Sequence, residues 1–502
     1  MKDVFFGKFA REKMLNGVDI VGNAVGGTLG PKGLNVFIQK DLQSIVTNDG
    51  ATISANIKLS DPLEDLGAES IRNPSNQTND DAGDGTSTTV VVAQSLIHEA
   101  LKRPENAMEV RESLKEASEK VLKLLTKRST KIAKEDIEKV ALISAEDKHL
   151  AKIISDIIIR LGEKAVINVE DSKTFATDYE IVDGYEATTG FISPHFINDK
   201  KTGKAIYENV PVLVTRKKIS NIQDIAPLFD QFAKQKINTC VIVCEEIDDS
   251  MIGVFVANKN MGLFNSLVIR SSGPVTEDIA GCTGARIVSD ESGVNFQNIT
   301  VDDLGRASKV VCDAHKTLFL GDGDASKTHA TILEKRAENE PNMYLQKNLK
   351  QRVARLRGGI AILRIAAASD FEREYLKLKA EDAIKATQAA LEEGIVEGGG
   401  MALWRIAQEL QGKTIGEEIL KKSLTAPLKR IIENAGKDYA EIIKDLPDGC
   451  GYDAKNDLYV DMIKAGICDP HKVERCALQN AISASTTFIT TFATITNHKD
   501  EK

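Results

Sequence analysis

The 502-residue sequence lacks the short motifs that most directly assign a chemistry. Gly-Lys-Thr occurs once, at 412–414, but Ala407 stands where the phosphate-binding loop GxxxxGK[ST] requires its first glycine, so this motif is absent. The seven cysteines are an odd number, and no pair has the CxxC spacing that is typical of zinc sites. They predict reduced thiols in a cytosol-like compartment, without a disulfide framework or a cysteine-held metal.

Hydropathy and charge exclude two further kinds of partner. No apolar run is long enough to cross a membrane, and no signal peptide or Arg-rich transit segment is recognisable, so we expect a cytoplasmic protein without a membrane partner. The net charge is −9 and no long basic run occurs, which argues against nucleic acid as a partner. Aromatic residues are scarce, but the balance of apolar and charged residues is that of a globular protein. A chain of this length should divide into two or three domains.

The most informative segment that is present is 79–89, Asn-Asp-Asp-Ala-Gly-Asp-Gly-Thr-Ser-Thr-Thr. Gly83 and Gly85 allow backbone conformations that are closed to other residues. The hydroxyls that follow lie beside the unpaired N–H groups of a first helical turn, which together attract an anion. Asp84 in such a site requires a cation, which favours a Mg²⁺–phosphate pair. An ordinary helix N-cap, which Ser, Thr and Asp also favour, is the alternative.

A second glycine-rich segment, 28–33, is Thr-Leu-Gly-Pro-Lys-Gly and separates a helical stretch from a strand-like one. Two glycines and a proline predict a sharp, rigid turn whose backbone can approach a ligand closely. Asn48-Asp49-Gly50 predicts a hairpin-type turn that carries a second acid. If a nucleotide binds, it therefore binds through glycine turns and hydroxyls rather than through a loop lysine.

The periodicity of the chain changes twice. Residues 1–126 favour helices at 8–25, 62–73, 86–102 and 107–126, with a hairpin near 30–54, and Pro74 should end or kink its helix. An amphipathic helix at 150–161 and a strand at 165–169 follow. From about 183 to 360, short apolar strands alternate with helical spacing, which is an α/β pattern. After a helix at 370–392 the chain returns to helices. The helical N- and C-terminal segments thus flank the α/β segment, and we expect them to share one domain. The strands expected in and after the middle part are 212–214, 240–244, 267–269, 287–288, 318–320 and 360–365, with a hairpin-like segment at 449–462.

The order and spacing of several short segments resemble those of group I chaperonins, the GroEL family, over residues 2–496. These segments are 28–33, 48–50, 82–89, 190–198, 219–222, 381–383 and 392–400. The resemblance implies a multidomain α+β chaperonin fold in three parts. They are a mainly helical equatorial domain (1–126 and 393–502), a small α/β intermediate domain (127–182 and 361–392) and an α/β apical domain (183–360).

The resemblance also implies roles for individual residues. Asp84 would hold Mg²⁺, with K⁺ as a further candidate ion. Asp49 would be a catalytic residue near the γ-phosphate and the water, and Asp469 would hydrogen-bond the ribose hydroxyls. Asp382 would orient the attacking water once the middle segment swings toward the nucleotide; spacing alone would make it an exposed acid beside Glu381. The ATP-binding residues implied are Thr28, Leu29, Gly30, Pro31, Asp84, Gly85, Thr86, Ser87, Thr88, Thr89, Gly398, Gly399, Gly400, Tyr452, Asp453, Ala454 and Asp469.

Apolar residues at helical spacing near 225–232 and 252–256 are ordinarily core. The resemblance instead implies a groove for unfolded protein clients. Its contacts would be Phe191, His195, Phe196, Ala226, Phe229, Ile252, Val256 and Ala257.

The function implied is that of an ATP-dependent chaperone, an ATPase whose subunits form a ring that encloses unfolded clients under a small co-chaperonin lid. The ring would be homo-oligomeric and sevenfold, with one or two rings. Asn48, in place of a lysine, and Asp453, in place of an asparagine, depart from the family pattern and should alter affinity or rate. An ATP-independent holdase ring is the first alternative. A small-molecule kinase is the second, and the lack of an acceptor-substrate constellation disfavours it.

Overall fold

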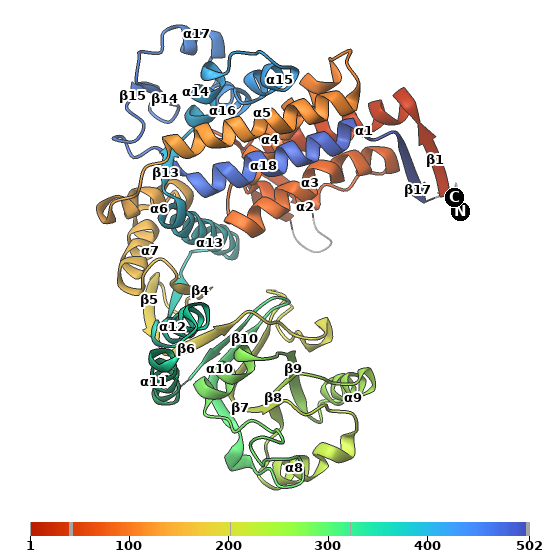
Figure 1. The fold of residues 1–502 in the computed structure, drawn as a ribbon, viewed down its shortest axis with the longest axis vertical. Coiled ribbons are helices and arrows are strands. Elements are labelled where there is room, and N and C mark those ends of the chain that lie inside the picture. Colours follow the sequence, from red (N-terminus) through yellow and green to blue (C-terminus); the bar gives the residue numbers. More distant parts are fainter. Residues whose placement is uncertain (1, 40–43, 201, 322, 498–502) are drawn as a thin grey trace. The chain divides into compact units, whose positions relative to one another are not determined.

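The structure is a computed structural model that describes residues 2–39, 44–200, 202–321 and 323–497 (Figure 1). Its contacts divide the chain into two compact units. The first comprises Met1–Lys164, Val169–Asp178 and Arg364–Lys502, and the second comprises Ala165–Asn168 and Tyr179–Leu363. None of the helices in the described ranges is both long and apolar enough to cross a bilayer.

Five long helices form the centre of the first unit: α1 (Gly7–Gly26), α3 (Pro62–Ala82), α4 (Thr86–Leu101), α5 (Ala107–Arg128) and α18 (His471–Ile489). They pack because each buries an apolar stripe, and α4 is buried on most of its surface. Although α18 is nearly 400 residues away in sequence, it lies against α3 and α4 (Figure 1). The two outer segments of the chain therefore belong to the same compact unit.

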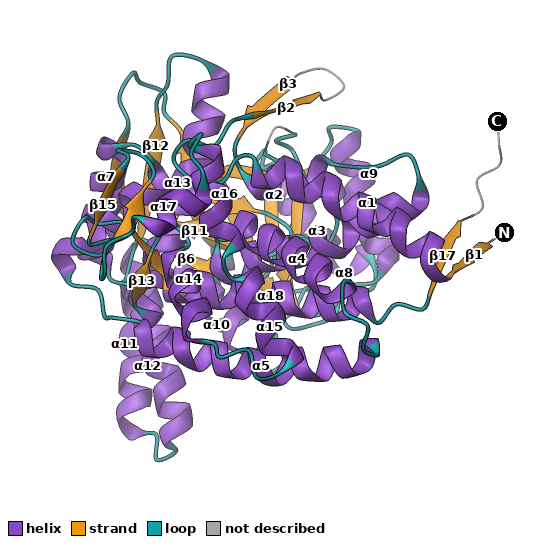
Figure 2. Ribbon diagram, turned by 90° about the horizontal axis from the view of Figure 1, so that it is seen from above, coloured by secondary structure: helices purple, strands orange, loops and turns teal. Residues whose placement is uncertain are grey.

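The two ends of the described chain also meet. Strand β1 (Lys2–Phe6) pairs antiparallel with β17 (Ala493–Asn497), so that Lys2 lies opposite Asn497. Figure 2 shows this ribbon projecting beyond the helices of the first unit. A second hairpin joins β2 (Val36–Gln39) to β3 (Ser44–Thr47), and its turn, part of the predicted hairpin near 30–54, lies outside the described residues.

Two local predictions in this unit were wrong. Helix α3 does not end or break at Pro74 but continues to Ala82. The missing N–H costs one helical hydrogen bond, and packing of α3 against α1 and α18 outweighs that loss. Asp49 does not lie in a hairpin turn: it caps α2 (Gly50–Asn56), and its carboxylate accepts from the N–H groups of Ala51 and Thr52.

A smaller group of helices lies below the central helices of the first unit in Figure 1. It consists of α6 (Ile137–Ala145), α7 (Lys148–Leu161) and α13 (Asp370–Glu393). The helices predicted at 150–161 and 370–392 are thus confirmed. The remaining elements of the unit are 3₁₀ helix η1 (Lys134–Asp136), β13 (Ile395–Glu397), α14 (Met401–Glu409), α15 (Ile415–Ser423), α16 (Ala426–Asn434), α17 (Tyr439–Lys444), β14 (Gly451–Asp453), β15 (Leu458–Val460) and β16 (Cys468–Pro470). Strands β14 and β15 form the predicted hairpin, and β13 pairs with β16.

The second unit is built on a six-stranded sheet in the order β6-β11-β10-β7-β8-β9. Its strands are β6 (Gly184–Ala187), β7 (Ala205–Thr215), β8 (Thr239–Cys244), β9 (Asn265–Arg270), β10 (Gly305–Cys312) and β11 (Thr317–Leu320). Strands β7, β8 and β9 are parallel, and the others pair antiparallel. Residues 287–288, which were predicted as a strand, form only a single bridge from Val288 to Thr215.

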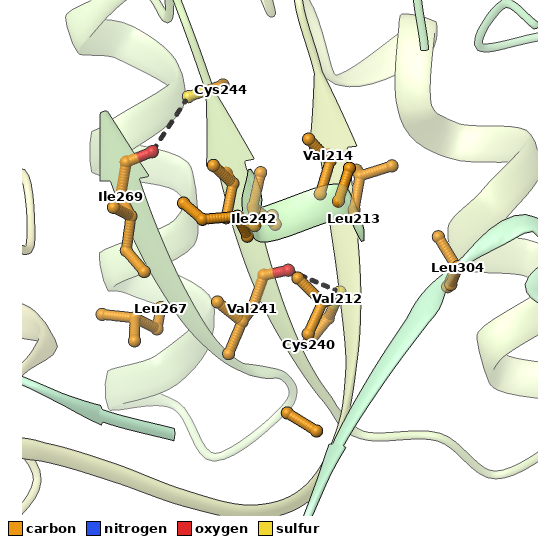
Figure 3. Packing of buried hydrophobic residues seen from close by; sticks show 14 of the residues in the cluster. Val212, Leu213, Val214, Cys240, Val241, Ile242, Cys244, Leu267, Ile269 and Leu304 are labelled. Carbon is orange, nitrogen blue, oxygen red and sulfur yellow. Dashed lines mark hydrogen bonds between the residues drawn. The ribbon is translucent and has the colours of Figure 1, made fainter. Parts of the chain in front are cut away.

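The position of the strands in the sheet explains why the apolar runs and the cysteines of β8 are buried. Side chains of β7, β8 and β9 fill the core, as Figure 3 shows for Val212, Val241 and Leu267. Burial raises the pKa of the Cys240 and Cys244 thiols to about 12, so these groups are inert packing. The helices of the unit are η2 (Pro194–Phe196), α8 (Ile222–Lys234), α9 (Asp249–Asn260), α10 (Pro274–Thr283), η3 (Val301–Asp303), α11 (Gly323–Asn339) and α12 (Met343–Arg357). The segments through which the chain passes from one unit to the other contain β4 (Val166–Asp171), β5 (Asp178–Val182) and β12 (Ile360–Ile365).

Candidate functional site

The segment 79–89 forms a tight loop that ends α3 and begins α4. Gly83 and Gly85 have φ angles of 77° and 86°, which explains why glycine stands at both positions. Gly85 is the N-cap residue of α4, and no side chain caps the first turn of that helix. The N–H groups of this turn therefore remain for another acceptor, and the ordinary side-chain cap that was the alternative is not formed.

The loop before α2 lies directly against this turn. A Cβ atom placed on Gly50 would come within 2.5 Å of the Ser87 Oγ and 2.8 Å of the Thr86 Oγ1, so a side chain at position 50 would displace these hydroxyls. Ser87 and Thr88 are partly exposed, whereas Thr89 is buried and its hydroxyl bonds to the Gly85 carbonyl at 2.9 Å. The hydroxyls predicted to hold phosphate thus divide into two that are accessible and two, Thr86 and Thr89, that are buried.

Three carboxylates meet beside these hydroxyls. Asp84 accepts hydrogen bonds from the Gly85 N–H at 2.5 Å and the Ser144 hydroxyl at 3.1 Å. Its burial raises its pKa, and Asp49 adds to the increase. Burial, followed by the charges of Asp84 and Asp49, holds the pKa of Asp382 well above its ordinary value. This concentration of negative charge needs a cation or protons to be stable.

Asp382 reaches this position because α13 packs on the loop. The Lys385 Cβ lies 2.1 Å from the place where a Cβ of Gly83 would be, so no other residue fits at position 83. Asn48 forms a hydrogen bond with Tyr375 of α13. The sequence predicted that Asp382 approaches only after the middle segment moves; in this structure α13 already lies against the loop. Asp382 is half-buried, whereas Glu381 is exposed.

The carboxylates fit Mg²⁺ only together with a ligand. The described residues contain no group of three or more His, Cys, Asp or Glu side chains arranged to hold a metal ion, so they do not form a complete cage. Mg²⁺ commonly takes one or two protein carboxylates and completes its shell with phosphates and waters. Asp84, beside the uncapped turn of α4, suits that arrangement.

Asp469 lies at a second edge of the site. Its Oδ2 accepts from the Gly399 N–H at 3.1 Å, and burial together with the charge of Asp84 raises its pKa to about 7. Gly398 and Gly400 have an explanation inside the chain. A Cβ atom on Gly398 would lie 3.0 Å from the Cys468 nitrogen, and one on Gly400 would lie 2.6 Å from the Leu428 nitrogen. Neither glycine therefore needs a ribose to explain it.

The predicted turn at 28–33 and the predicted base-contact residues are brought together by packing. Leu29 contacts the apolar cluster that includes Tyr452 and Ala454. The Thr28 hydroxyl donates to the Val25 carbonyl at 2.8 Å, while Gly30 and Pro31 are exposed. The backbone of this turn is thus better placed to meet a ligand than the Thr28 side chain.

The polar groups of the predicted base-contact residues are used inside the chain. The Tyr452 hydroxyl donates to Asp457 at 2.7 Å. The Asp453 carboxylate accepts from the Lys455 N–H at 2.9 Å and from the Asn456 amide at 2.7 Å. Asp453 therefore stabilises the β14–β15 turn, which explains a carboxylate at this position without a nucleotide.

In the second unit, the predicted client groove is only partly at the surface. Phe196 is completely buried beneath Lys259, whose ammonium group donates to the carbonyls of His195 and Ile197 at 3.0 Å. The prediction that Phe196 contacts clients is therefore wrong for this structure. Phe191, Ala226, Phe229, Ile252 and Val256 are partly exposed, and His195 and Ala257 are exposed. Of the α8 stripe, Ile225, Leu228 and Phe232 are core residues.

Sequence reasoning missed four residues near these sites. Met261 and Leu263, just after α9, are each 64% exposed and are the most accessible large apolar side chains beside the predicted groove. Near the carboxylates it missed Lys379, one helical turn before Asp382, and Glu474, five residues after Asp469. Helical spacing from Asp382 is the signal that would have found Lys379, and the spacing of two residues that face each other across a helix start is the signal for Glu474.

Comparison with known proteins agrees with the fold. Residues 21–499 match the TCP-1/cpn60 chaperonin family. The chain is similar to the chaperonin gp146 from the bacteriophage EL 2 (Pseudomonas aeruginosa), crystallised in the presence of ATP-BeFx in two crystal forms. For crystal form II the TM-score is 0.71, with 19% identity and 99% of each chain covered. For crystal form I the TM-score is 0.67, with the same identity and coverage. At this identity the likeness shows the fold, and the family match covers nearly the whole chain. The protein is therefore a chaperonin, a member of the TCP-1/cpn60 family with its multidomain α+β fold.

Proposed function

We propose that this chaperonin is an ATP-dependent folding machine in which the first unit hydrolyses ATP and the second unit binds unfolded clients. One observation carries the ATPase proposal: Asp49, Asp84 and Asp382 meet beside the uncapped first turn of α4. The site thereby offers the two kinds of group that a metal–nucleotide complex needs. Backbone N–H groups can donate to the phosphates, and carboxylates can bind the cation.

The phosphates would lie at the first turn of α4, where the N–H groups and the accessible Ser87 and Thr88 hydroxyls donate to them. Asp84 would hold Mg²⁺, which neutralises the phosphate charge when bound, and K⁺ is a further candidate ion. The turn at 28–33 and Asp469 would contact the remainder of the nucleotide. These roles agree with the resemblance and with the placement of the residues.

Asp382 would orient the attacking water and accept its proton. The water oxygen forms a bond to the γ-phosphorus as the bond to ADP breaks, and the products are ADP and phosphate. A carboxylate with a raised pKa is a stronger base than an ordinary aspartate, which suits this role. Asp49 caps α2 beside the same site. Its carboxylate is held in place by the backbone N–H of Thr52, whose nitrogen lies 2.7 Å from the Asp49 Oδ2.

Client capture would use the exposed apolar side chains of the second unit. Val256, Met261 and Leu263 belong to one stretch of chain in and after α9, and an unfolded segment could bury them. The holdase alternative would need the same surface without hydrolysis, and the three gathered carboxylates favour the cycling chaperone. The kinase alternative has no observation in its support.

Subunits would assemble into a homo-oligomeric ring, sevenfold with one or two rings, that works with a small co-chaperonin lid. Support for assembly comes from the ribbon formed by β1 and β17, where Phe6 is 58%, Phe492 78% and Ile495 60% exposed. Apolar side chains gathered in this way on one ribbon are characteristic of a contact surface.

The decisive test is an ATPase assay without any acceptor molecule, combined with light scattering and with capture of an unfolded test protein. A cycling chaperonin hydrolyses ATP unaided, forms a large particle and binds the test protein. A holdase would bind the protein without turnover. Turnover that requires a small-molecule acceptor would identify a kinase and refute the proposal.

A further inference from the structure

The start of α18 brings two carboxyl groups together. Pro470 is the N-cap residue of this helix, so Asp469 precedes the cap and Glu474 is the fourth helical residue. Side chains at these two positions often pack against each other across a helix start, as a pair of apolar residues. Here both are acids, and the charge of Asp469 is the foremost charge acting on Glu474.

Glu474 is buried without the partners that a buried acid normally has. Its side chain is 4% exposed, and none of the residues that the structure describes forms a hydrogen bond with its Oε2. Its basic neighbours in the helix do not compensate: Lys472 pairs with Glu392 and Arg475 pairs with Glu393, both on α13. An unpaired buried acid is costly, and such groups usually have a role.

Glu474 also lies beside the phosphate loop. A Cβ atom on Gly85 would come within 2.7 Å of the adjacent Val473, so the first turn of α18 packs on the start of α4. The two charges that act on Glu474, Asp469 and Asp84, belong to the two edges of the proposed nucleotide site. Burial and these charges raise the pKa of Glu474 to about 8, which leaves it largely protonated at neutral pH.

We infer that Glu474 is a further recognition residue of the nucleotide site, which together with Asp469 forms a carboxyl pair that binds the ribose hydroxyls of the nucleotide. This inference rests on the proposed nucleotide site and adds a residue to it. In the pair, one carboxylate accepts from a ribose hydroxyl, and the protonated partner can donate to a ribose oxygen. The unpartnered Oε2 marks Glu474 as a buried acid that the described residues alone do not satisfy.

The test compares the binding of ADP, 2′-deoxy-ADP and 3′-deoxy-ADP by isothermal titration calorimetry, since none of them is hydrolysed. The variants are Glu474→Gln, which keeps shape and neutrality, and Glu474→Leu, which restores the usual apolar contact. We expect the wild type to prefer ADP over at least one deoxy analogue by roughly tenfold, the value of one good hydrogen bond. Glu474→Leu should reduce that preference at least about threefold.

The pH dependence provides a second readout. From pH 7 to 9 the wild-type Glu474 loses its proton, and the new charge repels the phosphates and Asp84, so ADP binding should weaken. The glutamine of Glu474→Gln cannot ionise. The loss of ADP affinity between pH 7 and 9 should therefore be smaller in this variant than in the wild type, by a factor of about 3 or more. This arm remains decisive if Glu474→Leu does not fold.

The matched control is Glu417→Gln, a change at another buried glutamate of the same unit, which pairs with Lys120 at 2.7 Å. It should leave the preference for ribose hydroxyls unchanged. Equal preferences and equal pH profiles in the wild type and both Glu474 variants would overturn the inference and leave Glu474 a structural acid. A wild type that binds no ADP at all would instead refute the proposed function.

Discussion

Replacing Asp382 by asparagine separates nucleotide binding from hydrolysis. The change keeps the size of the side chain and removes its ability to accept a proton. Because Asp84 and the first turn of α4 remain, ATP affinity should be nearly unchanged, while turnover should fall by about 10²–10⁴, the usual scale for a positioned acid–base group. This fall corresponds to about 3–5 kcal/mol in the activation barrier.

The same change should affect stability with a definite sign. The pKa of Asp382 is raised in the folded chain, so the folded chain holds this proton more tightly than the unfolded chain does. The unfavourable contribution of Asp382 is therefore absent below the ordinary pKa of 3.8 and grows as the pH rises toward the raised value. Without nucleotide, Asp382→Asn should consequently melt at a higher temperature than the wild type at pH 7, and at nearly the same temperature at acidic pH.

Glu381→Gln is the matched control, because Glu381 is the adjacent acid of α13 and is exposed. It should change neither turnover nor melting temperature appreciably. Phosphate release and bound nucleotide are measured on the same sample, and melting is followed by calorimetry. Near-normal turnover in Asp382→Asn, or equal effects of the two substitutions, would refute the reasoning and make Asp382 an ordinary helical acid.

Three further predictions concern the other sites. Asp84→Asn should weaken Mg-ATP binding and turnover together, measured by titration and phosphate release; unchanged affinity would remove Asp84 from the metal site. Val256→Glu combined with Leu263→Glu should abolish capture of an unfolded protein but leave ATPase activity intact, because an unpaired charge is costly to bury. Asn260→Glu, at an exposed polar position of α9, is the control. Undiminished capture by the double variant would place the groove elsewhere. Phe492→Asp should dissociate the proposed oligomer toward the 54.7 kDa subunit in light scattering, and an unaffected particle would exclude the β1–β17 ribbon as a contact.

The client prediction uses Val256 and Leu263 rather than Phe229 for a structural reason. The ring of Phe229 lies 4.7 Å from that of Phe264 and 5.6 Å from that of Phe232, so it belongs partly to the core. A glutamate there would destabilise the second unit, and lost capture could not be separated from lost folding. Val256 also packs at the edge of this core, so Leu263→Glu alone, at a side chain that is 64% exposed, is the variant that avoids this ambiguity.

The sequence by itself determined the features that arise from local chemistry. The tight loop at Gly83 and Gly85 follows from the need for left-handed backbone at both positions, and α4 follows from the apolar run behind it. The parallel strands of the second unit were predictable because short, fully apolar runs such as 240–244 favour buried strands. The order of the motifs was enough to indicate the family, which the match over residues 21–499 confirms.

Only the tertiary structure decided the features that depend on distant neighbours. Helix α3 continues through Pro74 because α1 and α18 pack against it, which no local rule includes. Phe196 is core rather than surface because Lys259 and the carbonyls around it close over its ring. Asp382 differs from Glu381 only because α13 lies on the loop at Gly83, and Glu474 lies near Asp84 only because α18 begins against α4. Residue type and spacing specify which groups are available, whereas burial and proximity, which set their charge state, come from packing.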